Sequence, residues 1–217
     1  MEDEEKHVVF NQILSAVGYM HEQGFAHCDL KPENVLVKNT AFVKICDFGG
    51  ATRIRYDATG QEIPQTEMVG TASYDAPLKR LSMPSKPSKD DVWSIGLILF
   101  WLFTEDVLWI EADEDDEDFF SWSQGVAPPG FDSLEPQIVR ILNWTLSADE
   151  DLRPTVKELL QHSGTKPNSK DVLRPPTGFS MAPPPGFSVP TMASPPGLAS
   201  PMAPPPGFEH VKPKLFS

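Results

Sequence analysis

The stretch WSIGLILFWLF, from Trp93 to Phe103, constrains the fold of this chain more than any other feature of the sequence. It is apolar on nearly every side of a helix, and a helix of that kind must be surrounded by protein. It is also too short to cross a bilayer. The sequence therefore predicts a central buried helix over Asp91–Phe103, with other elements packed around it.

Three further helices are predicted around this centre. Apolar residues recur at helical spacing over 10–21, and Gln23-Gly24 should end that helix because glycine adopts the left-handed cap conformation easily. A second amphipathic pattern covers Glu135–Leu146. The last helix lies in RPTVKELLQH, with Pro154 at an early helical position and Thr155 near its start.

Little β structure is expected. The runs NVLV and FVKIC flank the polar turn KNTA, which favours a small β-hairpin, and a long irregular stretch follows over 47–89. The fold class is thus mainly α, helical with one small hairpin. Residues 1–163 have the composition of a globular domain.

The tail over 164–217 differs in kind. It holds 14 of the 23 prolines and repeats the phrases RPPTGF, APPPGF, ASPPGL and APPPGF, whose spacing is too irregular for a solenoid. Such a segment favours polyproline II and is disordered in isolation. A similar phrase, APPGF at 127–131, is expected to be a loop between helices.

The charge of the chain restricts its partners. The net charge is −13, and the domain alone carries 13 basic and 29 acidic residues. This excludes nucleic acid and anionic membranes as partners and favours a basic protein. The block EADEDDED over Glu111–Asp118 is either a solvated loop or a docking surface for such a partner.

The cysteines and the first residues indicate the compartment. Cys28 and Cys46 form neither a disulfide framework nor a CxxC pair, and MEDEEKHVVF is acidic where a signal peptide would be basic. An intracellular protein, cytoplasmic or nuclear, is expected.

The segment HCDLKPEN carries the chemistry. Asp29, Lys31 and Asn34 lie within six positions, and Asp47 of CDFGG follows thirteen residues after Asn34. A carboxylate base, an ammonium and two oxygen ligands for Mg²⁺ are what phosphoryl transfer requires.

Five motifs in order resemble the eukaryotic protein kinases, specifically their C-terminal lobe. HCDLKPEN is similar to the HRD-L-K-x-x-N pattern and CDFGG to DFG; GTASYDAP resembles the end of an activation segment, DVWSIG the central helix, and LRPT the closing Arg motif. The resemblance covers residues 1–163 and implies a partial kinase domain. The lysine in KPEN resembles the serine/threonine branch.

The resemblance implies a role for each matching residue. Asp29 would orient the substrate hydroxyl and accept its proton, and Lys31 would neutralise the γ-phosphate of ATP. Thr71 would brace both. Asn34 and Asp47 would hold the Mg²⁺ ions, and Leu36 would lie in the floor under adenine.

Other matching residues would have structural roles. Asp91 would anchor the catalytic loop by its backbone, while His27 and Phe48 would be core residues of the family's packing spine. Cys46 is interpreted as a small buried apolar residue. A reactive thiol is the alternative, because Cys46 lies beside Asp47.

Two substitutions depart from the family pattern. Cys28 replaces the HRD arginine, which in the family pairs with a phosphorylated activation segment, so we predict activity that does not depend on such a phosphate. Leu78 replaces the acidic partner of Arg153. Arg153 should therefore be more exposed, or pair with another acid, of which Asp75 is the nearest to position 78 in the sequence.

A third departure precedes the helix that starts near Phe10. Nothing there resembles the glycine-rich loop, strand lysine or partner glutamate of the family's N-lobe. We expect that the N-lobe is absent from this chain, that half the ATP site is missing with it, and that an exposed apolar face results. A fragment of a longer protein explains this most simply.

Two functions follow. The first is a serine/threonine protein kinase that transfers the ATP γ-phosphate to a protein, represented by a partial catalytic domain. The alternative is a non-catalytic, pseudokinase-like scaffold that displays the tail. In the tail, the PPG-hydrophobic phrases resemble ligands of GYF domains. The tail is therefore expected to be either a ligand of a GYF-type adaptor or a plain disordered linker.

Overall fold

The computed structural model describes residues 1–38, 42–66, 69–162 and 209–210. The tail repeats between 164 and 208, with their predicted disorder and adaptor ligands, lie outside these residues. In the described part of the chain, no helix combines the length and apolar character needed to cross a membrane.

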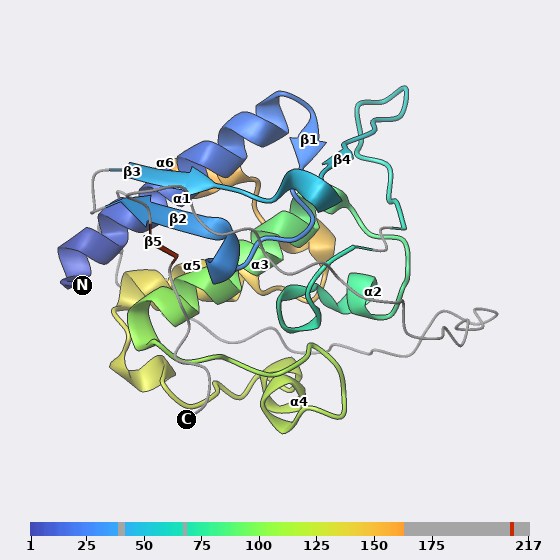
Figure 1. The fold of residues 1–217 in the computed structure, drawn as a ribbon. Coiled ribbons are helices and arrows are strands. Elements are labelled where there is room, and N and C mark those ends of the chain that lie inside the picture. Colours follow the sequence, from blue (N-terminus) through green and yellow to red (C-terminus); the bar gives the residue numbers. More distant parts are fainter. Residues whose placement is uncertain (39–41, 67–68, 163–208, 211–217) are drawn as a thin grey trace.

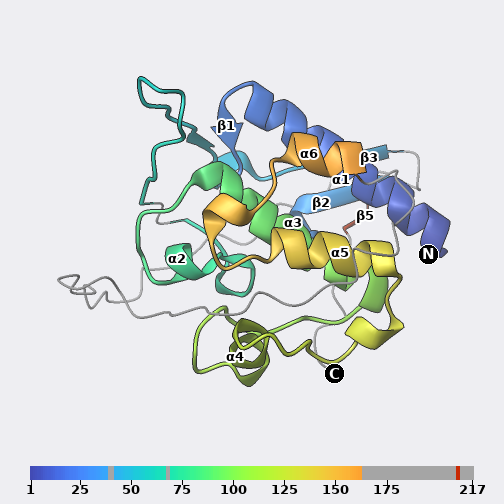
Figure 2. The same cartoon turned by 180° about the vertical axis from the view of Figure 1, so that it is seen from behind.

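Helix α3 (Pro87–Thr104) is the centre of the fold, as the sequence predicts (Figure 1). Every residue from Asp90 to Leu102 is buried. Helices α1 (Asp3–Glu22) and α5 (Pro136–Thr145) pack against it, and α6 (Val156–His162) packs against α1. Figure 2 shows α5 and α6 on the back of the molecule, where the rings of Trp144 of α5 and His162 of α6 lie 5.4 Å apart. The three predicted flanking helices are thus confirmed.

The ends of these helices follow their local chemistry. α1 begins earlier than its apolar pattern predicts, because acidic residues fill its first turn and the Glu2 amide donates to Glu5 Oε2 at 3.0 Å. Gly24 ends it with a φ of 80°. At α6, the Glu158 amide donates to Thr155 Oγ1 and the Thr155 amide to Glu158 Oε2, a reciprocal capping box.

The β structure forms two small sheets among the described residues. The predicted hairpin is confirmed as β2 (Val35–Lys38) and β3 (Phe42–Ile45), antiparallel with Val35 opposite Ile45. The sequence analysis missed the second sheet, in which β1 (Phe25–Ala26) pairs with β4 (Thr52–Arg53). Strands of two residues leave no period-2 pattern to detect.

Strand β5 (Glu209–His210) lies within the segment predicted to be disordered. β5 runs antiparallel to β2, with His210 opposite Leu36 and Glu209 opposite Val37. The reason is that β3 occupies one edge of β2, and the other edge presents backbone groups that an extended segment can pair with.

Short elements fill the rest of the chain. The stretch predicted as irregular contains η2 (Phe48–Gly50), η3 (Ala72–Tyr74) and the single-turn helix α2 (Pro77–Arg80). Beyond α3 follow α4 (Glu117–Ser123), η4 (Phe131–Ser133) and η5 (Glu150–Leu152). APPGF joins α4 to α5 as a loop, as predicted, and buries Phe131.

The acidic block is partly structural. Asp116 Oδ1 accepts the amides of Asp118 and Phe119 and so caps α4, and Glu111 pairs with Arg80 of α2. Asp116 and Glu111 thus stabilise the fold. These contacts do not decide between the two predicted roles of the block, a solvated loop and a docking surface for a basic partner.

Gly96 sets the distance between α3 and α5. A Cβ at this position would lie 2.4 Å from Thr145 Oγ1 and 2.9 Å from Leu146 Cδ2. Only a residue without a side chain lets α3 approach the end of α5 this closely.

We predict that Gly96→Ala destabilises the fold by about 1–3 kcal/mol, because the added methyl overpacks the contact. Gly18→Ala in α1 is the matched control, since its Cβ would meet only ordinary contacts at 3.4 and 3.5 Å. It should leave stability unchanged or raise it by up to about 1 kcal/mol through helix propensity. Urea unfolding of both variants measures the difference; equal effects would contradict the packing argument.

Candidate active site

Asp91 of α3 holds the segment that contains HCDLKPEN. Its buried carboxylate accepts the backbone amides of His27 and Cys28, each at 2.8 Å, and lies 2.8 Å from His21 Nε2 at the end of α1. Cys28 takes a left-handed conformation, with φ of 64°, which costs a non-glycine residue free energy. Its amide bond to Asp91 helps to hold the chain in that turn. The predicted anchor is therefore present in the structure.

Burial alone would raise the pKa of the Asp91 carboxyl. The hydrogen bond and charge of His21, with the two loop amides, outweigh burial and lower the pKa below its ordinary value. Asp91 is thus ionised wherever the protein is folded near neutral pH. His21 was missed by the sequence analysis, which read it as a position on an apolar helix face.

Asp29, Lys31 and Thr71 form a closed triangle of polar contacts. Lys31 Nζ lies 2.9 Å from Asp29 Oδ2 and donates to Thr71 Oγ1 at 2.7 Å, while Thr71 Oγ1 donates to Asp29 Oδ1 at 2.7 Å. Thr71 comes from a different segment of the chain, forty residues after Lys31 in the sequence. The side chains are half-buried, so the carboxylate stays accessible at its edge. The predicted bracing by Thr71 has the geometry expected of it.

Asn34 links this triangle to the DFG-like segment. Its Nδ2 donates to the Asp29 carbonyl at 2.8 Å, which leaves Oδ1 as the atom of this side chain able to bind a metal. Its own carbonyl accepts the Cys46 amide at 3.0 Å. The residue before Asp47 is therefore hydrogen-bonded to Asn34, and the two predicted ligands come from adjoining segments.

Asp47 is exposed and takes a left-handed conformation, with φ of 62°. Its Oδ1 accepts the Gly49 amide at 3.4 Å, a long contact. Burial, and then the charge of Asp47, raise the pKa of the Cys46 thiol. This weighs against the reactive thiol and favours an inert, half-buried side chain.

The oxygen donors fit Mg²⁺ bound together with phosphates. Within the described residues, no group of three or more His, Cys, Asp or Glu side chains is placed to hold a metal ion. Asn34 and Asp47 supply two oxygen ligands of the type that Mg²⁺ prefers. A Mg²⁺ ion usually takes only one or two carboxylates from the protein and completes its shell with phosphates and water.

His27 and Phe48 differ in how far they are buried. His27 is fully buried, and its Nδ1 accepts the Asp29 amide at 3.3 Å while Nε2 lies 3.0 Å from the Cys46 carbonyl. Phe48 touches the His27 ring, with centroids 5.3 Å apart, but is 53% exposed. The prediction of a core residue is wrong for Phe48 in this chain, because the described elements cover only the ring face toward His27.

Leu36 and Cys28 are both buried. Leu36 lies on β2, in the strand that follows the Asn34 turn, and is the residue opposite His210 of β5. Cys28 packs with Ala26 and Ile54 in a small cluster of its own. The thiol thus faces apolar neighbours in place of a phosphate.

Arg153 pairs with Asp90, so the candidate Asp75 was wrong. The Arg153 side chain is fully buried, 3.6 Å from Asp90 Oδ1, and donates to the carbonyls of Ser147 at 2.8 Å and Lys89 at 3.1 Å. Its guanidinium lies 5.0 Å from the centre of the Trp93 ring. Asp75 pairs with Lys79 instead. Asp75 was chosen because it is close to Leu78 in the sequence, whereas Asp90 meets Arg153 only through the fold.

We predict a pH effect from this pair. Burial raises the pKa of Asp90 to about 7. The charge of Arg153 and the hydrogen bond from Ser85 oppose this and lower the pKa. Since an unfolded Asp ionises near 3.8, the unfolded chain loses this proton first, and stability falls as pH rises from about 4 to about 7. Relative to Asp90→Asn, the wild type should lose about 1 kcal/mol per pH unit in that window, by urea unfolding.

The variant Ser85→Ala provides the check on sign. It removes a hydroxyl that donates to Asp90 and favours the ionised form, so the falling limb should extend to higher pH. Parallel pH profiles for the wild type and Asp90→Asn would contradict the assignment.

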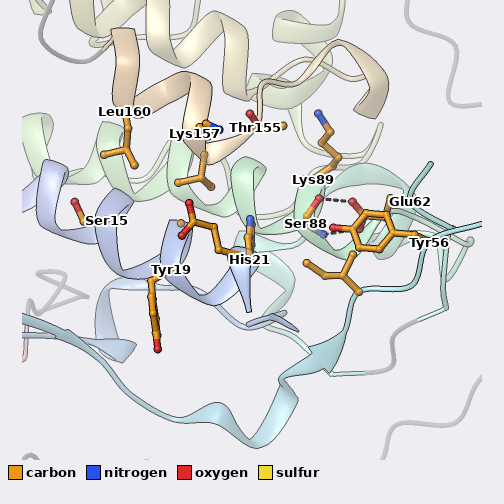
Figure 3. Close-up of a pocket in the computed structure, with 14 residues that line it drawn as sticks. Ser15, Tyr19, His21, Tyr56, Glu62, Ser88, Lys89, Thr155, Lys157 and Leu160 are labelled. Atoms are coloured by element: carbon orange, nitrogen blue, oxygen red, sulfur yellow. Dashed lines mark hydrogen bonds between the residues drawn. The ribbon is translucent and has the colours of Figure 1, made fainter. Parts of the chain in front are cut away.

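A separate cavity of about 490 Å³ lies between α1, α3 and α6 (Figure 3). His21 and Tyr19 of α1, Lys89 of α3 and Leu160 of α6 line it, together with Glu62, whose carboxylate accepts from Ser88. Its lining carries charges of both signs and includes none of Asp29, Lys31, Asn34 or Asp47. The cavity is therefore distinct from the cluster of these four residues.

Comparison with known proteins gives a consistent result. The family model described as protein kinase domain matches residues 1–163. The chain is 33% identical over 164 residues to sperm motility kinase 2B of Mus musculus, covering 75% of this chain and 32% of that protein. It is also 33% identical over 156 residues to serine/threonine-protein kinase chk1 of Schizosaccharomyces pombe, covering 70% and 31%. The chain thus spans about a third of the length of these relatives.

Proposed function

Because this chain belongs to the protein kinase family, we propose that it carries the catalytic loop of a serine/threonine protein kinase, which transfers the γ-phosphate of ATP to a protein hydroxyl. The observation that carries the proposal is the triangle of Asp29, Lys31 and Thr71. It places a carboxylate, an ammonium and a hydroxyl within hydrogen-bond distance of one another.

Asp29 is the residue that would receive the substrate proton. Thr71 and Lys31 each contact a different oxygen of its carboxylate, which fixes the orientation of the group before a substrate arrives. A base fixed in this way orients the attacking hydroxyl toward the phosphorus and accepts its proton as the bond forms.

In this proposal Lys31 has a second role, besides orienting Asp29. Its ammonium lies between Asp29 and Thr71 and is 21% exposed, so it can contact the γ-phosphate at the moment negative charge shifts to the oxygens. Positioning and charge stabilisation supply most of the catalysis in this reaction class.

Asn34 and Asp47 would hold Mg²⁺, which when bound neutralises the phosphates of ATP. Leu36, buried on β2, would form the floor beneath adenine. The groups of the family's N-lobe would complete the nucleotide site from the other side. The protein substrate would be basic in character, because the domain is strongly acidic.

We predict that Asp29→Asn lowers phosphate transfer by about 10²–10⁴-fold while leaving the fold intact, since the amide keeps the size of the side chain but cannot take a proton. The measurement is transfer from radiolabelled ATP, with Mg²⁺, to a library of Ser- and Thr-containing peptides by the full-length protein. Asp132→Asn, an exposed position in η4, is the matched control and should keep wild-type activity.

Two results would decide against the proposal. Equal rates for Asp29→Asn and the wild type would remove Asp29 from the reaction. Absence of any transfer by the full-length wild-type protein would favour the non-catalytic scaffold, in which the loop has a structural role only.

A further inference from the structure

Lys79 is a buried lysine that contacts the catalytic loop. It lies in α2, its side chain is 5% exposed, and its Nζ donates to the backbone carbonyl of Cys28. The same ammonium lies 2.9 Å from Asp75 Oδ1. A buried ammonium is costly unless it is paired and hydrogen-bonded, and here it is both.

Gly70 makes room for this ion pair. A Cβ on Gly70 would lie 2.2 Å from Asp75 Oδ1 and 2.6 Å from Lys79 Nζ. Gly70 directly precedes Thr71, whose hydroxyl donates to Asp29. The pair therefore packs beneath the backbone that presents Thr71, as well as against Cys28.

The peptide between Cys28 and Asp29 is held at both of its polar groups. Lys79 donates to its carbonyl oxygen, and its amide, on Asp29, donates to His27 Nδ1 at 3.3 Å. One residue earlier, Asp91 accepts the Cys28 amide. These contacts fix the left-handed turn from which the Asp29 side chain projects.

We propose that Lys79, paired with Asp75, is a positioning residue for Asp29, and that this permanent ion pair replaces a phosphate-dependent contact in ordering the loop. Cys28 occupies the position of an arginine that would bind an activation-segment phosphate, and its thiol packs against Ala26 and Ile54. The cation at the loop comes instead from Lys79, and the anion from Asp75, both within the segment that carries Thr71. This inference rests on the proposed function.

The test replaces the pair by apolar residues of similar size, as Asp75→Leu/Lys79→Met. Such a change is often neutral or stabilising, so the protein should remain folded. We expect a fall in kcat of about 10²-fold with little change in KM for ATP, because a small displacement of a catalytic group is enough to cause it. Amide exchange at Asp29, followed by mass spectrometry, should become faster.

Two further variants serve as a rescue and as a control. Lys79→Arg retains a buried cation and should recover part of the lost kcat. Lys86→Met, which removes the ion pair of Lys86 with Asp151 where α3 begins against η5, is the matched control and should leave kcat and loop exchange unchanged.

Phosphatase treatment of the wild type tests the replacement itself. Retained activity supports the proposal, and loss of activity overturns it. A folded double variant with wild-type kcat and wild-type exchange at Asp29 would also overturn it. If the wild type transfers no phosphate, the kinase proposal fails by itself, and faster exchange in the double variant still supports Lys79 as the anchor of the loop.

Discussion

The hydrogen bonds of Asp91 are the interaction on which the rest of the structure depends. One buried carboxylate joins the central helix, the end of α1 and the two amides that lead into Asp29. A buried charge without such donors would be strongly destabilising, so the loop and the helix stabilise each other. The HCDLKPEN segment is therefore attached to the most buried element of the fold.

The site is organised by a hierarchy of polar contacts around that anchor. Asp91 fixes the amides of the turn, His27 and Lys79 fix the peptide that follows, and Lys31 and Thr71 fix the carboxylate of Asp29. Asp91 and His27 are fully buried, whereas the Lys31 and Asp29 side chains keep 21% and 13% of their surface exposed. The Asp29 carboxylate, which these contacts orient, is therefore held on both of its oxygens and still partly exposed.

The sequence was sufficient for the features that leave a local pattern. The all-round apolar run predicted α3, and the spacing of Asp29, Lys31, Asn34 and Asp47 predicts a site whose residues the structure brings together from adjoining segments. What it missed depends on long-range packing: His21 meets Asp91 across seventy positions, and Arg153 meets Asp90 across the fold rather than Asp75. Phe48 was misjudged because burial depends on the elements above it, and a two-residue strand such as β5 carries no periodicity at all.

The contact at Gly96 has a consequence for motion. Because α3 and the end of α5 lie too close for even a methyl group, these helices cannot slide past each other without opening a tightly packed contact. The described residues between Asp47 and the start of α3 are different, because they form only short elements, among them η2, η3 and α2. Movement of that segment would leave the contact at Gly96 intact, whereas sliding of α5 along α3 would break it.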